Sequence, residues 1–115
     1  MYQFSYAEVN EDSSATARDR ERQALDHAIA LLERVEGKST RSREAIEAIY
    51  VTRNLWTILI EDLANAENQL PNELKANLIS IGLWVMRETE AIRMGRTDSF
   101  AAIADVTRTI RDGLE

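Results

Sequence analysis

The chain has 115 residues, no cysteine, a formal net charge of −6 at pH 7 and a sequence pI of about 4.9. This length suits one domain with a real core, and the lack of cysteine excludes disulfides and thiolate chemistry. The acidic balance repels phosphate backbones, so we do not expect direct contact with nucleic acid. No apolar run approaches the roughly 20 residues of a membrane span, and the N-terminus lacks the order of a signal peptide. We therefore expect a cytoplasmic protein without membrane insertion.

The glycines and the one proline divide the chain into four predicted helices. Gly37, Gly95 and Gly113 each follow a segment of helical period, where a left-handed residue closes a helix end at low cost. Pro71 suits the first turn of a helix. The predicted helices cover residues 14–36, 41–66, 71–94 and 99–112. No alternating runs predict a sheet. We predict an all-α, single-domain bundle over residues 1–115, with an aromatic N-terminal segment (1–13) before the bundle (14–115).

The first predicted helix (14–36) gathers its apolar residues in one stripe. The stripe contains Ala17, Ala24, Ala28, Leu31, Leu32 and Val35. A single stripe needs only one helical neighbour.

The second predicted helix (41–66) is apolar over about half of its circumference, whereas a surface helix needs about 100°. This arc contains Ala45, Ile49, Val51, Leu55, Trp56, Ile58, Leu59, Ile60 and Leu63. We therefore predict that this helix is central in the bundle, with Leu55 and Leu59 in the core.

The third predicted helix (71–94) has two apolar sides. One side contains Leu74, Leu78, Ile81, Val85 and Ile92, and Ile79, Leu83 and Met86 line up roughly opposite. This helix is either sandwiched between two others or presents its second side to a partner, since bound amphipathic helices use anchors of this spacing. Gly82 costs roughly 1 kcal/mol against alanine in a helix interior, so we expect a close backbone approach there, from inside or outside.

The last predicted helix (99–112) again needs one neighbour. Its apolar side contains Phe100, Ile103, Val106, Ile110 and Leu114. Asp98 or Ser99 is the expected N-cap.

Aromatic residues supply further candidates for partner binding. Trp56 and Trp84 suit a core as well as an interface, and core packing is the simpler interpretation for both. Tyr2, Phe4 and Tyr6 alternate, which places them on one face of an extended segment that either straps over the bundle or contacts a partner. The candidate partner-binding residues are Tyr2, Phe4, Tyr6, Ile79, Leu83, Trp84 and Met86.

The sequence contains no recognisable set of cooperating catalytic side chains. The one histidine, His27, has no nucleophile and orienting acid around it, and we expect it on the solvent side of its helix. Glu61 and Asp62 are adjacent and point to different sides of a helix, without a Glu-x-x-His motif to build a metal site. The run RDRERQ (18–23) mixes acids with its arginines, unlike a phosphate track. We predict no enzyme activity, no catalytic residue, no cofactor and no metal site.

Several segments in this order resemble the flagellar biosynthesis regulator FlaF family. They are MYQFSYAEV, RDRERQALD, SREAIEAIY, LWTILIEDLA, the LP-x-EL turn, LISIGLWVMRE and IRDGL. The resemblance implies a small cytoplasmic protein that binds flagellin as a chaperone, supports flagellin synthesis and export, and opposes the translational repressor FlbT. FlbT and the flagellar export apparatus are further implied partners. The alternative function is post-transcriptional regulation of flagellin through RNA or an RNA-binding partner such as FlbT.

The N-terminal rings generate a first testable prediction. Burial of each ring is worth roughly 1.5–3 kcal/mol, so deleting residues 1–9 is expected to lower either the melting temperature or the affinity for flagellin. A thermal melt measures the change in stability, and a flagellin titration measures the change in affinity. Loss of stability supports a strap over the bundle, loss of binding alone supports a partner contact, and no change in either contradicts both.

Overall fold

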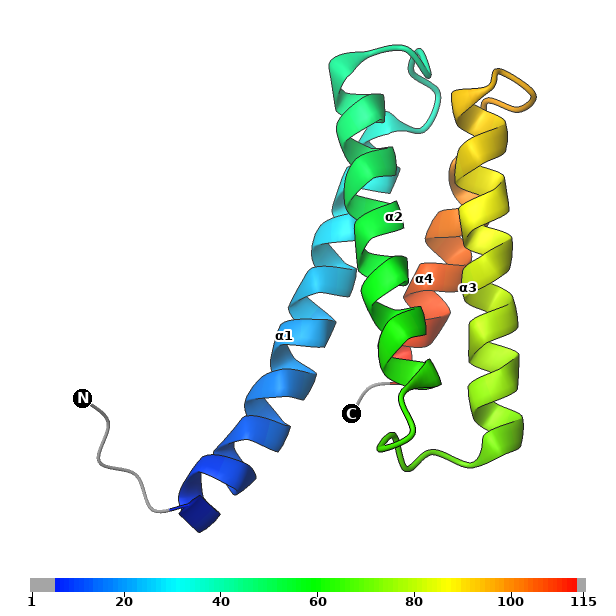
Figure 1. Ribbon diagram of the computed structural model, residues 1–115. Coiled ribbons are helices and arrows are strands. Elements are labelled where there is room, and N and C mark those ends of the chain that lie inside the picture. The colour runs from blue at the N-terminus through cyan, green and yellow to red at the C-terminus, as the bar shows by residue number, and fades with distance from the viewer. Residues whose placement is uncertain (1–5, 114–115) are drawn as a thin grey trace.

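Four helices run antiparallel in the computed structural model, which describes the backbone of residues 6–113 and the side chains of residues 19–113 (Figure 1). They are α1 (Tyr6–Val35), α2 (Arg43–Ala64), α3 (Asn72–Arg93) and α4 (Ala101–Asp112). No residue between 6 and 113 belongs to a strand, which confirms the all-α prediction. None of these helices is both long enough and apolar enough to cross a membrane.

Left-handed glycines follow the ends of α1 and α3, as predicted. Gly37 has a φ of 82° and Gly95 a φ of 77°, values that a side chain disfavours. Gly113 directly follows α4 but has a φ of −79°, so its expected left-handed conformation is wrong. Pro71 immediately precedes α3, and its carbonyl oxygen accepts the N–H of Lys75 at 3.0 Å.

The first helix begins earlier than its sequence pattern predicts. Its first residue is Tyr6 instead of Ser14, so Tyr6 lies in a helix and not in the predicted extended segment. The chain has no glycine or proline before Gly37 to interrupt a helix.

The start of α4 is held by a carboxylate from another helix end, and neither Asp98 nor Ser99 is the N-cap. Phe100 occupies that position without a side-chain cap and is fully buried. Its N–H donates to Glu36 Oε2 at 2.8 Å, just after the end of α1. The cap was not predicted because the acceptor is 64 residues away in the chain.

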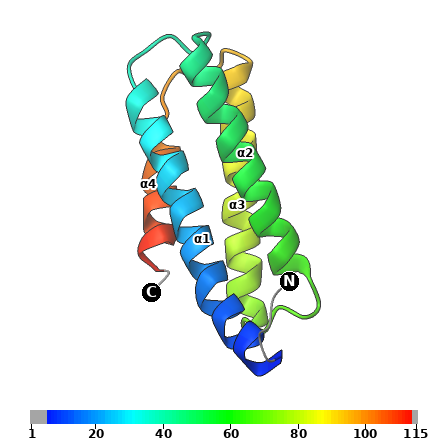
Figure 2. The same ribbon diagram turned by 90° about the vertical axis from the view of Figure 1, so that its left-hand side faces the viewer.

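The helices pack in the order α4, α1, α2, α3, and Figure 2 shows α4 beside α1 and α3 beside α2. The expectation that α1 needs one neighbour is wrong, since it packs against both α2 and α4. Its buried face also includes Leu25 and Ile29, which the predicted stripe omits. α4 packs mainly on one helix, as expected, and that helix is α1.

All four helices contribute to the main hydrophobic core. Its buried members are Leu31, Leu32, Val35, Ala45, Ala48, Ile49, Trp56, Val85, Ile92, Phe100, Ile103 and Ala104. Leu55 is buried with Leu25 and Ala28 in an adjoining cluster, and Leu59 is half-buried against both. The second helix lies between α1 and α3, as predicted, but Ile58 from its apolar arc is 57% exposed. Two neighbours leave part of that arc uncovered.

The close approach expected at Gly82 comes from inside the bundle. A Cβ atom built there would lie 2.8 Å from Ile60 Cγ1 and Cδ1 and 3.1 Å from Trp56 Cε3. Real carbon contacts are longer than this, so α2 packs directly on the α3 backbone where the side chain is missing.

We predict that Gly82→Ala destabilises the protein by about 1–2 kcal/mol, although alanine is the better helix former. Overpacking costs about 1–3 kcal/mol and outweighs the roughly 1 kcal/mol gained in helix propensity. Urea unfolding measures the change, with Ser80→Ala at an exposed position of α3 as the control. The control is expected to be neutral or slightly stabilising, and equal gains in both variants would contradict the packing argument.

Leu55→Ala is expected to cost about 2–5 kcal/mol, because Leu55 is buried and its removal leaves a cavity. Leu59→Ala should cost less, since Leu59 is only half-buried. Both free energies of unfolding come from the same urea titration. A loss below about 1 kcal/mol at Leu55 would show that this part of α2 does not form the core.

Candidate functional site

One flank of α2 lies beside one flank of α3. Arg53 joins the two, since its Nη1 donates to the carbonyl oxygen of Met86 at 2.9 Å. Ile46 and Tyr50 precede Arg53 by seven and three residues and share its flank. Ile79 and Leu83 precede Met86 by the same intervals and share that flank of α3. We call the combined surface the α2–α3 face, and it consists of Ile46, Tyr50, Ile79, Leu83 and Met86.

Much of the α2–α3 face is open to solvent. Ile46 is 60% exposed, Tyr50 69% and Leu83 47%. Ile79 and Met86 are half-buried, and Met86 packs against the main core. Scattered apolar residues are normal on a protein surface, but several gathered on one face are typical of an interaction site. This face is therefore the candidate functional site.

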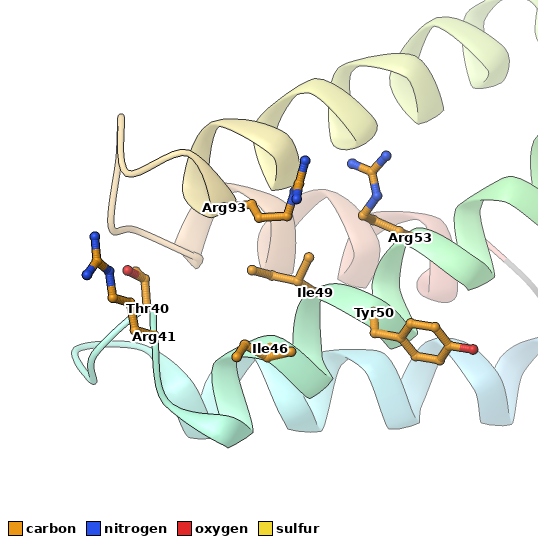
Figure 3. Close-up of a pocket in the computed structure, with 7 residues that line it drawn as sticks. All are labelled: Thr40, Arg41, Ile46, Ile49, Tyr50, Arg53 and Arg93. Atoms are coloured by element: carbon orange, nitrogen blue, oxygen red, sulfur yellow. The ribbon is translucent and has the colours of Figure 1, made fainter.

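A pocket of about 390 Å³ lies at the end of the face where α2 begins (Figure 3). It is lined by Thr40, Arg41, Ile46, Ile49, Tyr50, Arg53 and Arg93. Figure 3 shows three apolar side chains from α2 on one side and the Arg53 and Arg93 guanidinium groups on the other. The volume is at the lower end of the roughly 300–1,000 Å³ typical of ligand pockets.

A single carboxylate, Glu90, holds two of the three arginines. Glu90 Oε1 lies 2.6 Å from Arg93 Nη2, and Glu90 Oε2 lies 3.8 Å from Arg53 Nη1. Arg53 Nη1 also donates to Thr89 Oγ1 at 2.9 Å. The hydrogen bond from Arg93 lowers the pKa of Glu90 and raises the pKa of Arg93. The Glu90 carboxylate is therefore charged at neutral pH, and its attraction to Arg93 is lost as the pH falls through that lowered pKa.

Arg41 differs from the other two arginines. It is exposed in the segment between α1 and α2, and it forms no ion pair with any residue in the described part of the chain. The pocket thus brings three guanidinium groups together, and two of them share the Glu90 carboxylate, in a protein whose formal net charge is −6.

The structure brings together three of the sequence-predicted candidates and separates a fourth. Ile79, Leu83 and Met86 lie on the α2–α3 face, whereas Trp84 is half-buried on another flank of α3 and packs against the main core. Tyr2 and Phe4 lie outside the described residues. Tyr6 begins α1, and its side chain also lies outside the description.

Ile46 and Tyr50 of α2 were not predicted as candidates from the sequence, although both are more than half exposed. A signal was present, because both are apolar and both fall outside the predicted core arc of that helix. Apolar residues on the otherwise polar side of a helix indicate a second contact surface.

A second, smaller hollow of about 110 Å³ lies near the last turn of α4. Its apolar lining includes Trp56, Leu59, Leu63, Leu70, Leu78 and Ile110. The Nε1 of Trp56 is buried and has no hydrogen-bond partner in the described part of the chain. This hollow is the competing surface for a partner.

The polar residues considered for catalysis or metal binding lie at the surface. His27 is exposed, as predicted, and Glu61 and Asp62 are exposed as well. Within the described residues, no group of three or more histidine, aspartate or glutamate side chains is arranged to hold a metal ion.

Comparison with known proteins finds a family for this chain. Residues 2–114 match the family model described as Flagellar protein FlaF, which covers nearly the whole chain. Neither a curated protein nor a solved structure matches the chain.

Proposed function

The chain belongs to the FlaF family of flagellar proteins, and we propose that it acts in the cytoplasm as a non-enzymatic chaperone that binds flagellin on the α2–α3 face. In this function it holds flagellin ready for export and so supports flagellin synthesis. The observation that carries the proposal is the grouping of Ile46, Tyr50 and Leu83, three exposed apolar side chains from two helices, on one face.

The need for such a surface follows from the chemistry of flagellin. Flagellin subunits polymerise through amphipathic terminal helices, whose apolar sides associate prematurely unless they are covered. An amphipathic helix docks its apolar side into a groove through anchors at i, i+3, i+4 and i+7. The seam between α2 and α3, with apolar side chains on both sides, suits a helix of this kind.

The distribution of burial also suits a reversible partner. The face is supported underneath by the main core, through Ile49 and Met86, so the fold does not depend on an occupant. The most exposed side chains of the face, Ile46, Tyr50 and Leu83, lie on the solvent side of these two residues. A chaperone must release its cargo at export, which favours a moderate interface of this kind over an obligate one.

The proposal predicts that Leu83→Ser weakens the binding of flagellin at least about tenfold, while the melting temperature stays nearly unchanged. Loss of an anchor in the contact costs binding energy, whereas an exposed side chain contributes little to folding. Size-exclusion chromatography of the purified protein with flagellin tests whether a complex forms, and a titration measures its affinity.

Leu74→Ser provides a matched control on the same helix. Leu74 is 43% exposed, close to the 47% of Leu83, but it lies on the flank of α3 that carries Leu78 and Val85. The control is expected to bind flagellin normally. If Leu74→Ser weakens binding and Leu83→Ser does not, flagellin binds on the other flank. If the wild-type chain forms no complex, the chaperone proposal is wrong.

A further inference from the structure

The charges around the pocket specify what kind of segment it accepts. The lining brings Arg41, Arg53 and Arg93 together, and among the side chains of residues 19–113 Glu90 is the one carboxylate that pairs with any of them. The pocket therefore has a formal excess of two positive charges on a protein whose net charge is −6. Such a local reversal of sign attracts a group of the opposite charge.

The three arginines are not equally available to a partner. Arg53 is held by Met86 O and Thr89 Oγ1, both at 2.9 Å. Arg93 is engaged by both oxygens of Glu90, at 2.6 and 3.1 Å. Arg41 alone has its guanidinium group without an ion pair among the described residues, at the rim of the pocket.

The apolar floor of the pocket sets a second requirement for the segment that binds there. Ile46, Ile49 and Tyr50 line it from α2, and Figure 3 shows them next to the arginine side chains. A segment that fills the pocket must therefore present apolar side chains and an acidic side chain within the same one or two helical turns.

We propose that the pocket binds an amphipathic helix of flagellin that carries a carboxylate beside its apolar anchors, with that carboxylate paired to Arg41. This inference rests on the proposed function, and it adds the charge of the bound segment and the residue that recognises it. The apolar anchors cover Ile46 and Tyr50, and the pairing with Arg41 fixes which way along the α2–α3 face the helix lies.

The test compares Arg41→Glu with Arg22→Glu in titrations of the full chain with flagellin. Each reversal takes the formal net charge from −6 to −8, so the long-range repulsion changes equally. Arg22 is an exposed residue of α1, a helix that does not line the pocket. Arg41→Glu is expected to weaken binding at least about tenfold more than Arg22→Glu, because only Arg41 meets the carboxylate.

Ionic strength provides a second readout. Wild-type binding is expected to weaken between about 0.05 M and about 0.5 M salt, and Arg41→Gln should lose most of that dependence while keeping the melting temperature. Equal effects of Arg41→Glu and Arg22→Glu would overturn this inference but leave the chaperone proposal in place. Absence of any complex with the wild-type chain, at either ionic strength, would overturn both.

Discussion

The contact of Trp56 and Ile60 with the α3 backbone at Gly82 fixes the arrangement on which the rest of the bundle depends. A side chain at residue 82 would keep α2 and α3 apart, because interiors are packed too densely to absorb an extra methyl group freely. With the helices this close, Arg53 reaches across to the carbonyl oxygen of Met86 and to Thr89. The same contact sets the rotation of α3, and so turns Leu83 outward on the side where Tyr50 emerges from α2.

Local chemistry explains which parts of the fold were predictable. Gly37 and Gly95 end helices through their own backbone conformation, so their role is visible in the sequence alone. The number and order of the helices follow from the positions of the glycines and the proline. The start of α1 was predicted wrongly at Ser14 because a serine side chain can cap the start of a helix or lie inside one. No glycine or proline near Tyr6 marks the true start. The cap of α4 by Glu36 depends on a contact across the fold that no local pattern contains.

Helical periodicity predicts which residues share a flank but not how many neighbours cover it. Leu25 and Ile29 broaden the buried face of α1 enough for two neighbours, whereas Ile58 lies in an apolar arc and remains exposed. For the same reason the second apolar side of α3 was identified, but its continuation by Ile46 and Tyr50 was not. The two halves of the face become one surface only when α2 and α3 pack together, and the Arg53–Met86 hydrogen bond across that contact spans 33 residues of the chain.

The apolar side chains of the α2–α3 face and the arginines of the adjoining pocket contribute differently to the binding of a reversible partner. Exposed apolar side chains set the lifetime of a complex, whereas charges at the rim set its rate of formation and its orientation. At physiological ionic strength the Debye length is about 8 Å, so the arginines act on an acidic group only after it has come close to the pocket. The net charge of −6 is screened over the same distance, and within it repels a partner that approaches with an acidic surface. An amphipathic helix with a single well-placed carboxylate escapes that repulsion and gains the local attraction, whereas a uniformly acidic surface or a nucleic acid does not.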